Sequence, residues 1–103
     1  MNKQIILPDD CRTMAEVRAG VDATDRALMD LLDRRFGYMR AAARIKQARG
    51  EVRDEVRKAE VIANVKRDAA GRGLPEDALA EIWDRLVECS IAYEFGHWDE
   101  MRA

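Results

Sequence analysis

Residues 13–49 read TMAEVRAGVDATDRALMDLLDRRFGYMRAAARIKQAR, and this stretch decides the fold. Its apolar side chains recur at the three- and four-residue spacing of one helix face, and no proline interrupts them. Thr13 and Glu16 form the S/T-x-x-E pattern of a capping box, which predicts that a helix begins here. At 1.5 Å per residue this helix would be roughly 50 Å long, well beyond the diameter of a compact monomer of this size. The stretch therefore predicts a long helix that needs a partner.

The rest of the chain predicts two shorter helices. Gly71 and Gly73 stop the first, and Pro75 begins the second with acidic residues in its first turn. The expected segments are an extended lead-in over 1–12, a long helix over 13–49, a loop over 50–53, a short helix over 54–70 and a C-terminal helix over 75–101. Three helices of such unequal length do not close a compact core alone. We therefore predict a single all-α domain over 1–103 whose long, short and medium helices form an intertwined homodimer.

Composition argues against several classes of protein. The 103 residues carry a net charge of -2, two cysteines and one histidine. The near-neutral balance argues against nucleic-acid binding. The lack of a signal-peptide core and of an 18-residue apolar run predicts a cytoplasmic protein without a membrane span. Because the histidine and cysteines have no zinc-site spacing and no glycine-rich phosphate loop occurs, we expect no metal and no cofactor.

Three cations of the long helix are candidate binding residues. Arg35 and Lys46 fall within about 20° of one another on a helical wheel, beside the apolar stripe. Arg18 is turned away by about 80° to 100° and lies about 25 Å along the axis, so it reaches their site only from a second, antiparallel chain. Without a Ser/His/Asp set or nucleophile elbow, an enzyme built from these parts would act by binding and electrostatics on an anionic substrate. The same cations are also compatible with ordinary solvated side chains.

Four segments together resemble a known family. They are Pro8-Asp9-Asp10-Cys11, the stretch from Val17 to Asp25, the stretch from Leu31 to Phe36, and Ala43-Arg44-Ile45-Lys46. Each is weak alone, since R-x-x-[IV]-D-x-x-D occurs in many amphipathic helices, but their order and separations are specific. The chain resembles the all-α class of chorismate mutases, in the branch that includes the bacterial isochorismate-pyruvate lyases.

The resemblance implies a site for a small dicarboxylate, chorismate or isochorismate, that two chains of a homodimer share. Arg18 would bind a carboxylate in the partner's site, and Arg35 would bind one in its own chain. Lys46 would contact the ether oxygen and the adjacent carboxylate. Lys46 and Glu94 are thus the expected catalytic residues.

Further substrate-binding residues are implied by the same resemblance. Residues 52–57 match the mutase pattern V-R-D-x-x-R, in which the backbone of Asp54 binds the ring hydroxyl and Arg57 adds a third carboxylate contact. Ser90 and Glu94, one turn apart on the last helix, fall at two more active-site positions.

Two residues depart from the common pattern of the family. Many members have a glutamine at the Glu94 position that donates a hydrogen bond to the ether oxygen. Because a carboxyl group donates only while it is protonated, we expect activity to fall as the pH rises. Lys58 stands where a mutase glutamate often accepts a hydrogen bond from the ring hydroxyl, so that recognition comes from elsewhere or the substrate differs. A solvated Lys58 fits equally well.

These features favour a chorismate mutase, which forms prephenate on the route to phenylalanine and tyrosine. Its pericyclic reaction needs no nucleophile, only a held compact conformer and stabilised charge on the breaking ether oxygen. The alternative is a lyase of the same fold that releases pyruvate from isochorismate to give salicylate. The V-R-D-x-x-R loop favours the mutase, whereas the N-terminal P-D-D-C and the chain length favour the lyase. A third hypothesis is a non-catalytic helical dimer whose site has decayed at Glu94 and Lys58.

Overall fold

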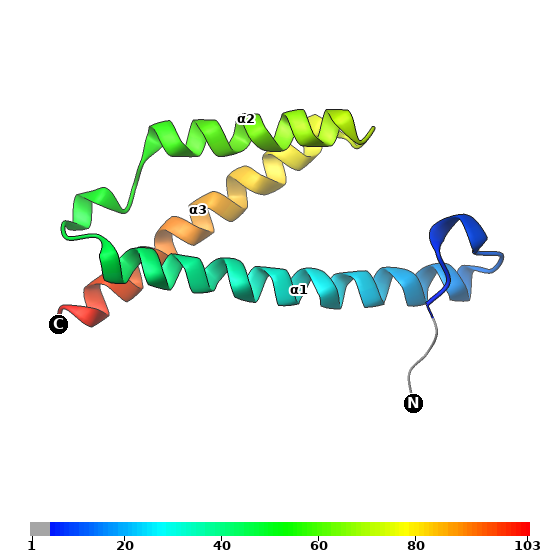
Figure 1. The fold of residues 1–103 in the computed structure, drawn as a ribbon, viewed down its shortest axis with the longest axis horizontal. Coiled ribbons are helices and arrows are strands. Elements are labelled where there is room, and N and C mark those ends of the chain that lie inside the picture. Colours follow the sequence, from blue (N-terminus) through cyan, green and yellow to red (C-terminus); the bar gives the residue numbers. More distant parts are fainter. Residues whose placement is uncertain (1–4) are drawn as a thin grey trace. The chain divides into compact units, whose positions relative to one another are not determined.

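The computed structural model describes residues 5–103, and this part of the chain contains helices and no strand (Figure 1). Three α-helices, α1 (Met14–Ile45), α2 (Glu55–Gly71) and α3 (Glu76–Met101), are accompanied by two short 3-10 helices, η1 (Pro8–Asp10) and η2 (Arg49–Glu51). The predicted all-α class with a long, a short and a medium helix is confirmed. The intertwined homodimer stays a prediction.

Two compact units make up the chain, Met1–Phe36 and Gly37–Ala103, and α1 runs through the boundary between them. In the described residues, no helix combines the length and the apolar character needed to cross a bilayer. The assignment of 1–103 to a single domain stays a prediction.

The start of α1 has the predicted capping box. The backbone N–H of Glu16 donates to Thr13 Oγ1 at 3.2 Å, and the N–H of Thr13 donates back to Glu16 Oε1 at 3.1 Å. The N–H of Arg12 donates a further hydrogen bond of 2.8 Å to the same oxygen. This bond is the largest cause of the lowered pKa of Glu16, and the bonds with Thr13 add to it. These bonds satisfy backbone donors that the first helical turn leaves open.

The lead-in is not extended throughout, in contrast to the prediction. Residues Pro8–Asp10 form η1, in which the N–H of Cys11 donates to the carbonyl of Pro8 at 3.2 Å. The ring of Pro8 fixes its φ near the value that such a turn requires. The part of the expected lead-in over 1–4 lies outside the described residues.

The long helix ends at Ile45, four residues before its predicted end. Glu51 Oε2 accepts hydrogen bonds from the N–H groups of Gln47, at 3.0 Å, and Ala48, at 3.3 Å. These two N–H groups therefore do not continue the hydrogen bonds of α1, and the backbone of Ala48 is extended, with φ -120° and ψ 139°. The helix ends early because the Glu51 side chain binds the N–H groups that would otherwise lengthen it.

A tight turn joins α2 to α3. The N–H of Leu74 donates to the carbonyl of Ala69 at 2.9 Å, and that of Gly73 donates to the carbonyl of Ala70 at 3.1 Å. This is a Schellman motif, and Gly73 has the positive φ of 70° that the motif requires. The predicted glycine stop is confirmed. The helices begin one residue later than expected, because Asp54 and Pro75 are their N-caps.

The core of the second unit lies where α2 and α3 pack against each other (Figure 1). Its buried residues are Val52, Val87 and Ile91, and four partly buried side chains pack on them, namely Val61, Ile62, Phe95 and Trp98. This core anchors the C-terminal half of α3 beside the segment that follows α1.

Within the first unit, α1 presents a stripe of exposed apolar side chains. The side chains are between 37% and 57% exposed and fall within about 100° on a helical wheel, and they are Met14, Val17, Val21, Leu28 and Leu31. We call this set the apolar stripe. An exposed stripe of this extent is typical of a helix that packs against another helix.

Candidate functional site

Lys46 and Glu94, the two residues predicted to be catalytic, form an ion pair. Lys46 Nζ lies 2.7 Å from Glu94 Oε2. The Glu94 side chain is 5% exposed, whereas that of Lys46 is 28% exposed, so the carboxylate is buried and the ammonium group lies at the border with solvent. A short, charge-assisted bond of this kind is strong because little water competes with it.

Ser90 extends this pair along α3. It lies one turn before Glu94, is 3% exposed, and donates its hydroxyl proton to the carbonyl of Leu86 at 2.7 Å. The i, i+4 spacing places Ser90 and Glu94 on one face of the helix. Two predicted site residues of α3 therefore share a buried polar row with the ammonium group of Lys46 at its edge.

The predicted loop residues have other partners. Asp54 is the N-cap of α2, and its carboxylate accepts from the backbone N–H of Arg57 at 3.0 Å. The Arg57 side chain is 62% exposed and pairs with Glu60 on its own helix. Neither side chain contacts the Lys46–Glu94 pair, so their predicted binding roles stay predictions.

The Lys58 side chain is 20% exposed and forms ion pairs with α3. Its ammonium group pairs with Glu88 at 2.8 Å and with Asp84 at 3.0 Å, both on α3. Arg53 donates to both carboxylate oxygens of Glu88, at 2.8 and 3.1 Å. These four residues, Arg53, Lys58, Asp84 and Glu88, form what we call the surface network.

Neighbouring charges in the surface network shift the pKa values of Glu88 and Lys58. Arg53 first and Lys58 second lower the pKa of Glu88 to about 2. Hydrogen bonds from Glu88 and then Asp84 raise the pKa of Lys58. Glu88 and Lys58 are therefore both charged at neutral pH.

Arg18 and Arg35 lie on the part of α1 that belongs to the first unit. Arg18 is exposed, and Arg35 is partly buried. Burial lowers the pKa of the Arg35 guanidinium. Arg35 follows Val17 by about five full turns, which puts it on the face of the apolar stripe. A guanidinium group beside apolar side chains is poorly solvated, so contact with an anion stabilises its charge.

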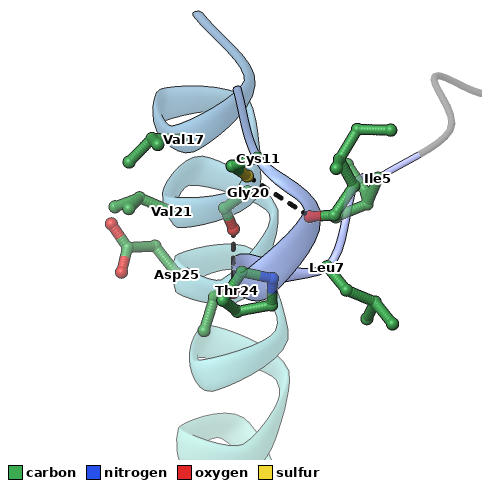
Figure 2. Close-up of a pocket in the computed structure, with 10 residues that line it drawn as sticks. Ile5, Leu7, Cys11, Val17, Gly20, Val21, Thr24 and Asp25 are labelled. Carbon is green, nitrogen blue, oxygen red and sulfur yellow. Dashed lines mark hydrogen bonds between the residues drawn. The ribbon is translucent and has the colours of Figure 1, made fainter. Parts of the chain in front are cut away.

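A cavity of about 440 Å³ opens in the first unit, between the lead-in and α1 (Figure 2). Ile5, Leu7, Val17 and Val21 contribute to its lining, and Asp25 is the charged side chain among the lining residues that the structure describes. None of the predicted site residues lines this cavity.

Comparison with known proteins assigns the class. The chain matches the family model described as chorismate mutase type II over residues 17–95, and it belongs to this family of enzymes that act on a small-molecule substrate. It is also similar to the isochorismate pyruvate lyase of Pseudomonas aeruginosa, with 26% identity over 95 residues, which cover 92% of this chain and 94% of that protein.

Several residues were missed in the sequence, and these take part in ion pairs with α3 or in hydrogen bonds with the end of α1. They are Arg53, Asp84 and Glu88 of the surface network, and Trp98 and Arg102, which donate to backbone carbonyls at the end of α1. Two spacing signals could have found them. Asp84 and Glu88 are an i, i+4 acidic pair, and Ser90, Glu94, Trp98 and Arg102 recur at every fourth residue, which predicts one continuous row on α3.

Proposed function

We propose that this protein is a chorismate mutase that converts chorismate to prephenate. The observation that carries the proposal is the buried Lys46–Glu94 pair, 2.7 Å apart, in a chain of the chorismate mutase type II family. Because carboxylates are usually exposed, a Glu94 side chain that is only 5% exposed favours a role in chemistry over one in solubility.

The proposed chemistry uses binding and electrostatics. In the rearrangement the ether C–O bond breaks as a C–C bond forms, and negative charge grows on the ether oxygen. In this proposal Lys46 exchanges Glu94 for that oxygen when the substrate binds, and Glu94, as the carboxylic acid, donates a second hydrogen bond to it. Donors that are held in place before the reaction stabilise such charge without reorganisation, and losing one costs about 10²- to 10³-fold in rate.

Arginines supply the remaining recognition in this proposal. Arg35 and Arg57 bind carboxylates of the substrate, the backbone of Asp54 binds the ring hydroxyl, and Ser90 contacts the substrate from α3. Arg57 must then leave Glu60, a change that is small in free energy because exposed ion pairs contribute little.

The proposal includes a homodimer in the cytoplasm. The apolar stripe of α1 is supporting evidence, since pairing with a second copy would bury side chains that are now 37% to 57% exposed. Arg18, exposed next to that stripe, is the residue that one chain contributes to the site of the other. Prephenate formation would serve the synthesis of phenylalanine and tyrosine.

A second function is a lyase that forms salicylate and pyruvate from isochorismate. The likeness to the Pseudomonas aeruginosa lyase over 92% of this chain favours it. The same cations would serve both pericyclic reactions, and the two proposals therefore differ in substrate and not in the site.

The test is a paired assay of the purified protein with chorismate and with isochorismate, following prephenate, salicylate and pyruvate. Lys46→Met, prepared in parallel, controls for enzymes carried over from the host. Prephenate that forms with the wild type and not with the variant supports the mutase. Salicylate with equimolar pyruvate supports the lyase instead, and no turnover of either substrate overturns both proposals.

A further inference from the structure

We propose that Trp98 and Arg102 are positioning residues that hold Lys46 in place for catalysis. The inference deepens the proposed function, on which it rests. Lys46 is the first residue after α1, where a chain ordinarily begins to fray. A catalytic cation at such a position needs an anchor, because a displacement of about 1 Å can cost 10²-fold in rate.

The anchor consists of hydrogen bonds to the backbone of Lys46 itself. Its carbonyl oxygen accepts from Trp98 Nε1 at 3.1 Å and from Arg102 Nη2 at 2.7 Å. Arg102 Nη1 also donates to the carbonyl of Ala43 at 3.1 Å. Two carbonyls that the last turn of α1 would leave open are thus held by α3.

Trp98 and Arg102 are themselves fixed. The Arg102 guanidinium carbon lies 4.2 Å from the centre of the Trp98 ring, a cation–π contact. The Trp98 ring packs on the core of Val52, Val87 and Ile91. The hydrogen-bond donors are therefore tied to the most buried part of the second unit.

One ridge of α3 contacts Lys46 at both ends. Glu94 and Trp98 lie on one face of α3, and Arg102, the C-cap residue, continues their four-residue spacing. Glu94 binds the ammonium group of Lys46, and the other two bind its carbonyl. The same row of residues therefore binds both the backbone carbonyl and the side-chain ammonium group of Lys46, whereas a surface ion pair holds only the charged end of a side chain.

The inference predicts a specific kinetic defect. Because the contact of Lys46 with the ether oxygen strengthens as charge develops there, a misplaced Lys46 lowers kcat more than it raises KM. We expect Arg102→Gln to lower kcat about 10-fold or more, with a smaller change in KM. Trp98→Phe, which removes the N–H donor and keeps an apolar ring, should produce the same pattern to a lesser degree.

Arg49→Gln is the matched control. The Arg49 guanidinium lies 4.5 Å from the centre of the Phe95 ring and pairs with Asp99 at 2.9 Å, so this variant also loses a cation over an α3 ring. Arg49 has no hydrogen bond to the carbonyl of Lys46. Its kcat should stay within about twofold of the wild type. Trp83→Phe is the corresponding control for Trp98→Phe.

Turnover of the variants is measured together with the ¹H–¹⁵N signal of the Lys46 ammonium group, identified by its loss in Lys46→Met. A kcat loss and a shifted ammonium signal in Arg102→Gln and Trp98→Phe, partial recovery in Arg102→Lys and neither change in the controls support the inference. If Lys46→Met is inactive but Arg102→Gln and Trp98→Phe match their controls, the inference is wrong and the proposed function stands. If Lys46→Met keeps full turnover, the proposed function fails first, and the inference with it.

Discussion

Two lysine–glutamate pairs join α3 to the rest of the second unit, and their contact distances are nearly equal. Lys46 lies 2.7 Å from Glu94, and Lys58 lies 2.8 Å from Glu88. Their burial differs, since the Glu94 side chain is 5% exposed and that of Glu88 is 36% exposed. Distance alone therefore does not distinguish a chemical site from a structural one.

The two pairs also differ in how fully their charges are compensated. Glu88 receives hydrogen bonds from Arg53 as well as Lys58, and Lys58 in turn binds Asp84. This network ties Arg53 and the α2 residue Lys58 to α3 through several charges. Glu94, by contrast, pairs with Lys46 and lies one turn from Ser90.

Removing Arg35 and Lys46, the two cations proposed to bind the substrate, should abolish turnover. We expect the double variant Arg35→Ala with Lys46→Ala to lose all measurable activity, because in the proposed mechanism the substrate loses a carboxylate contact and the donor to its ether oxygen. Helicity by circular dichroism and the mass of the proposed dimer by light scattering should be unchanged. Residual activity near that of the wild type would place the chemistry elsewhere.

Mixing two inactive chains should restore half of the sites. If Arg18 completes the site of the partner chain as proposed, a heterodimer of an Arg18→Ala chain and an Arg35→Ala chain has one site with both arginines and one site with neither. The specific activity of the purified heterodimer should be about half that of the wild type. A heterodimer as inactive as its parents would exclude a site that two chains share.

Replacing Glu94, the proposed second donor to the ether oxygen, should change the pH profile. If a protonated Glu94 donates to the ether oxygen, wild-type turnover falls as the pH rises, and Glu94→Gln keeps its activity in the alkaline range. The measurement is kcat/KM from acidic to alkaline pH for both proteins. A variant without any relative gain at high pH would contradict a donor role for Glu94.

Breaking the surface network should have the smallest effect. Glu88→Gln should keep near wild-type turnover and lose a little stability. Since the pKa of Glu88 is lowered from 4.5 to about 2, its contribution is present above about pH 4.5 and is lost as the pH falls toward 2. The free energies of unfolding of the two proteins, measured with urea over this range, should converge at low pH. If the difference in unfolding free energy is the same at every pH, the ion pairs of Glu88 are not its cause.

The fold was largely predictable because its signals are local. The capping box of Thr13 and Glu16 and the glycine stop at Gly73 act within a few residues, and both were read correctly. The end of α1 was not, since Glu51 redirects the backbone and the donors of Trp98 and Arg102 come from more than 50 residues away. Periodicity alone carries no information about such distant partners.

The candidate site was predictable in its centre and less so at its margins. The resemblance named Lys46, Glu94 and Ser90, and these lie in one buried row or at its edge. It could not name the partners of Arg57 and Lys58, because a surface charge pairs with whichever opposite charge its rotamers reach. Burial, which sequence indicates poorly for charged residues, is what separates the two groups.

The most direct test of this account is a matched pair of variants, Lys46→Met and Lys58→Met. Each replaces one lysine of an ion pair with an apolar side chain of similar length. With the substrate that the wild type turns over, we expect Lys46→Met to lose about 10²-fold or more in kcat, and Lys58→Met to stay within a few-fold. Equal losses in the two variants, or the larger loss in Lys58→Met, would contradict the assignment of the buried Lys46–Glu94 pair as the catalytic centre.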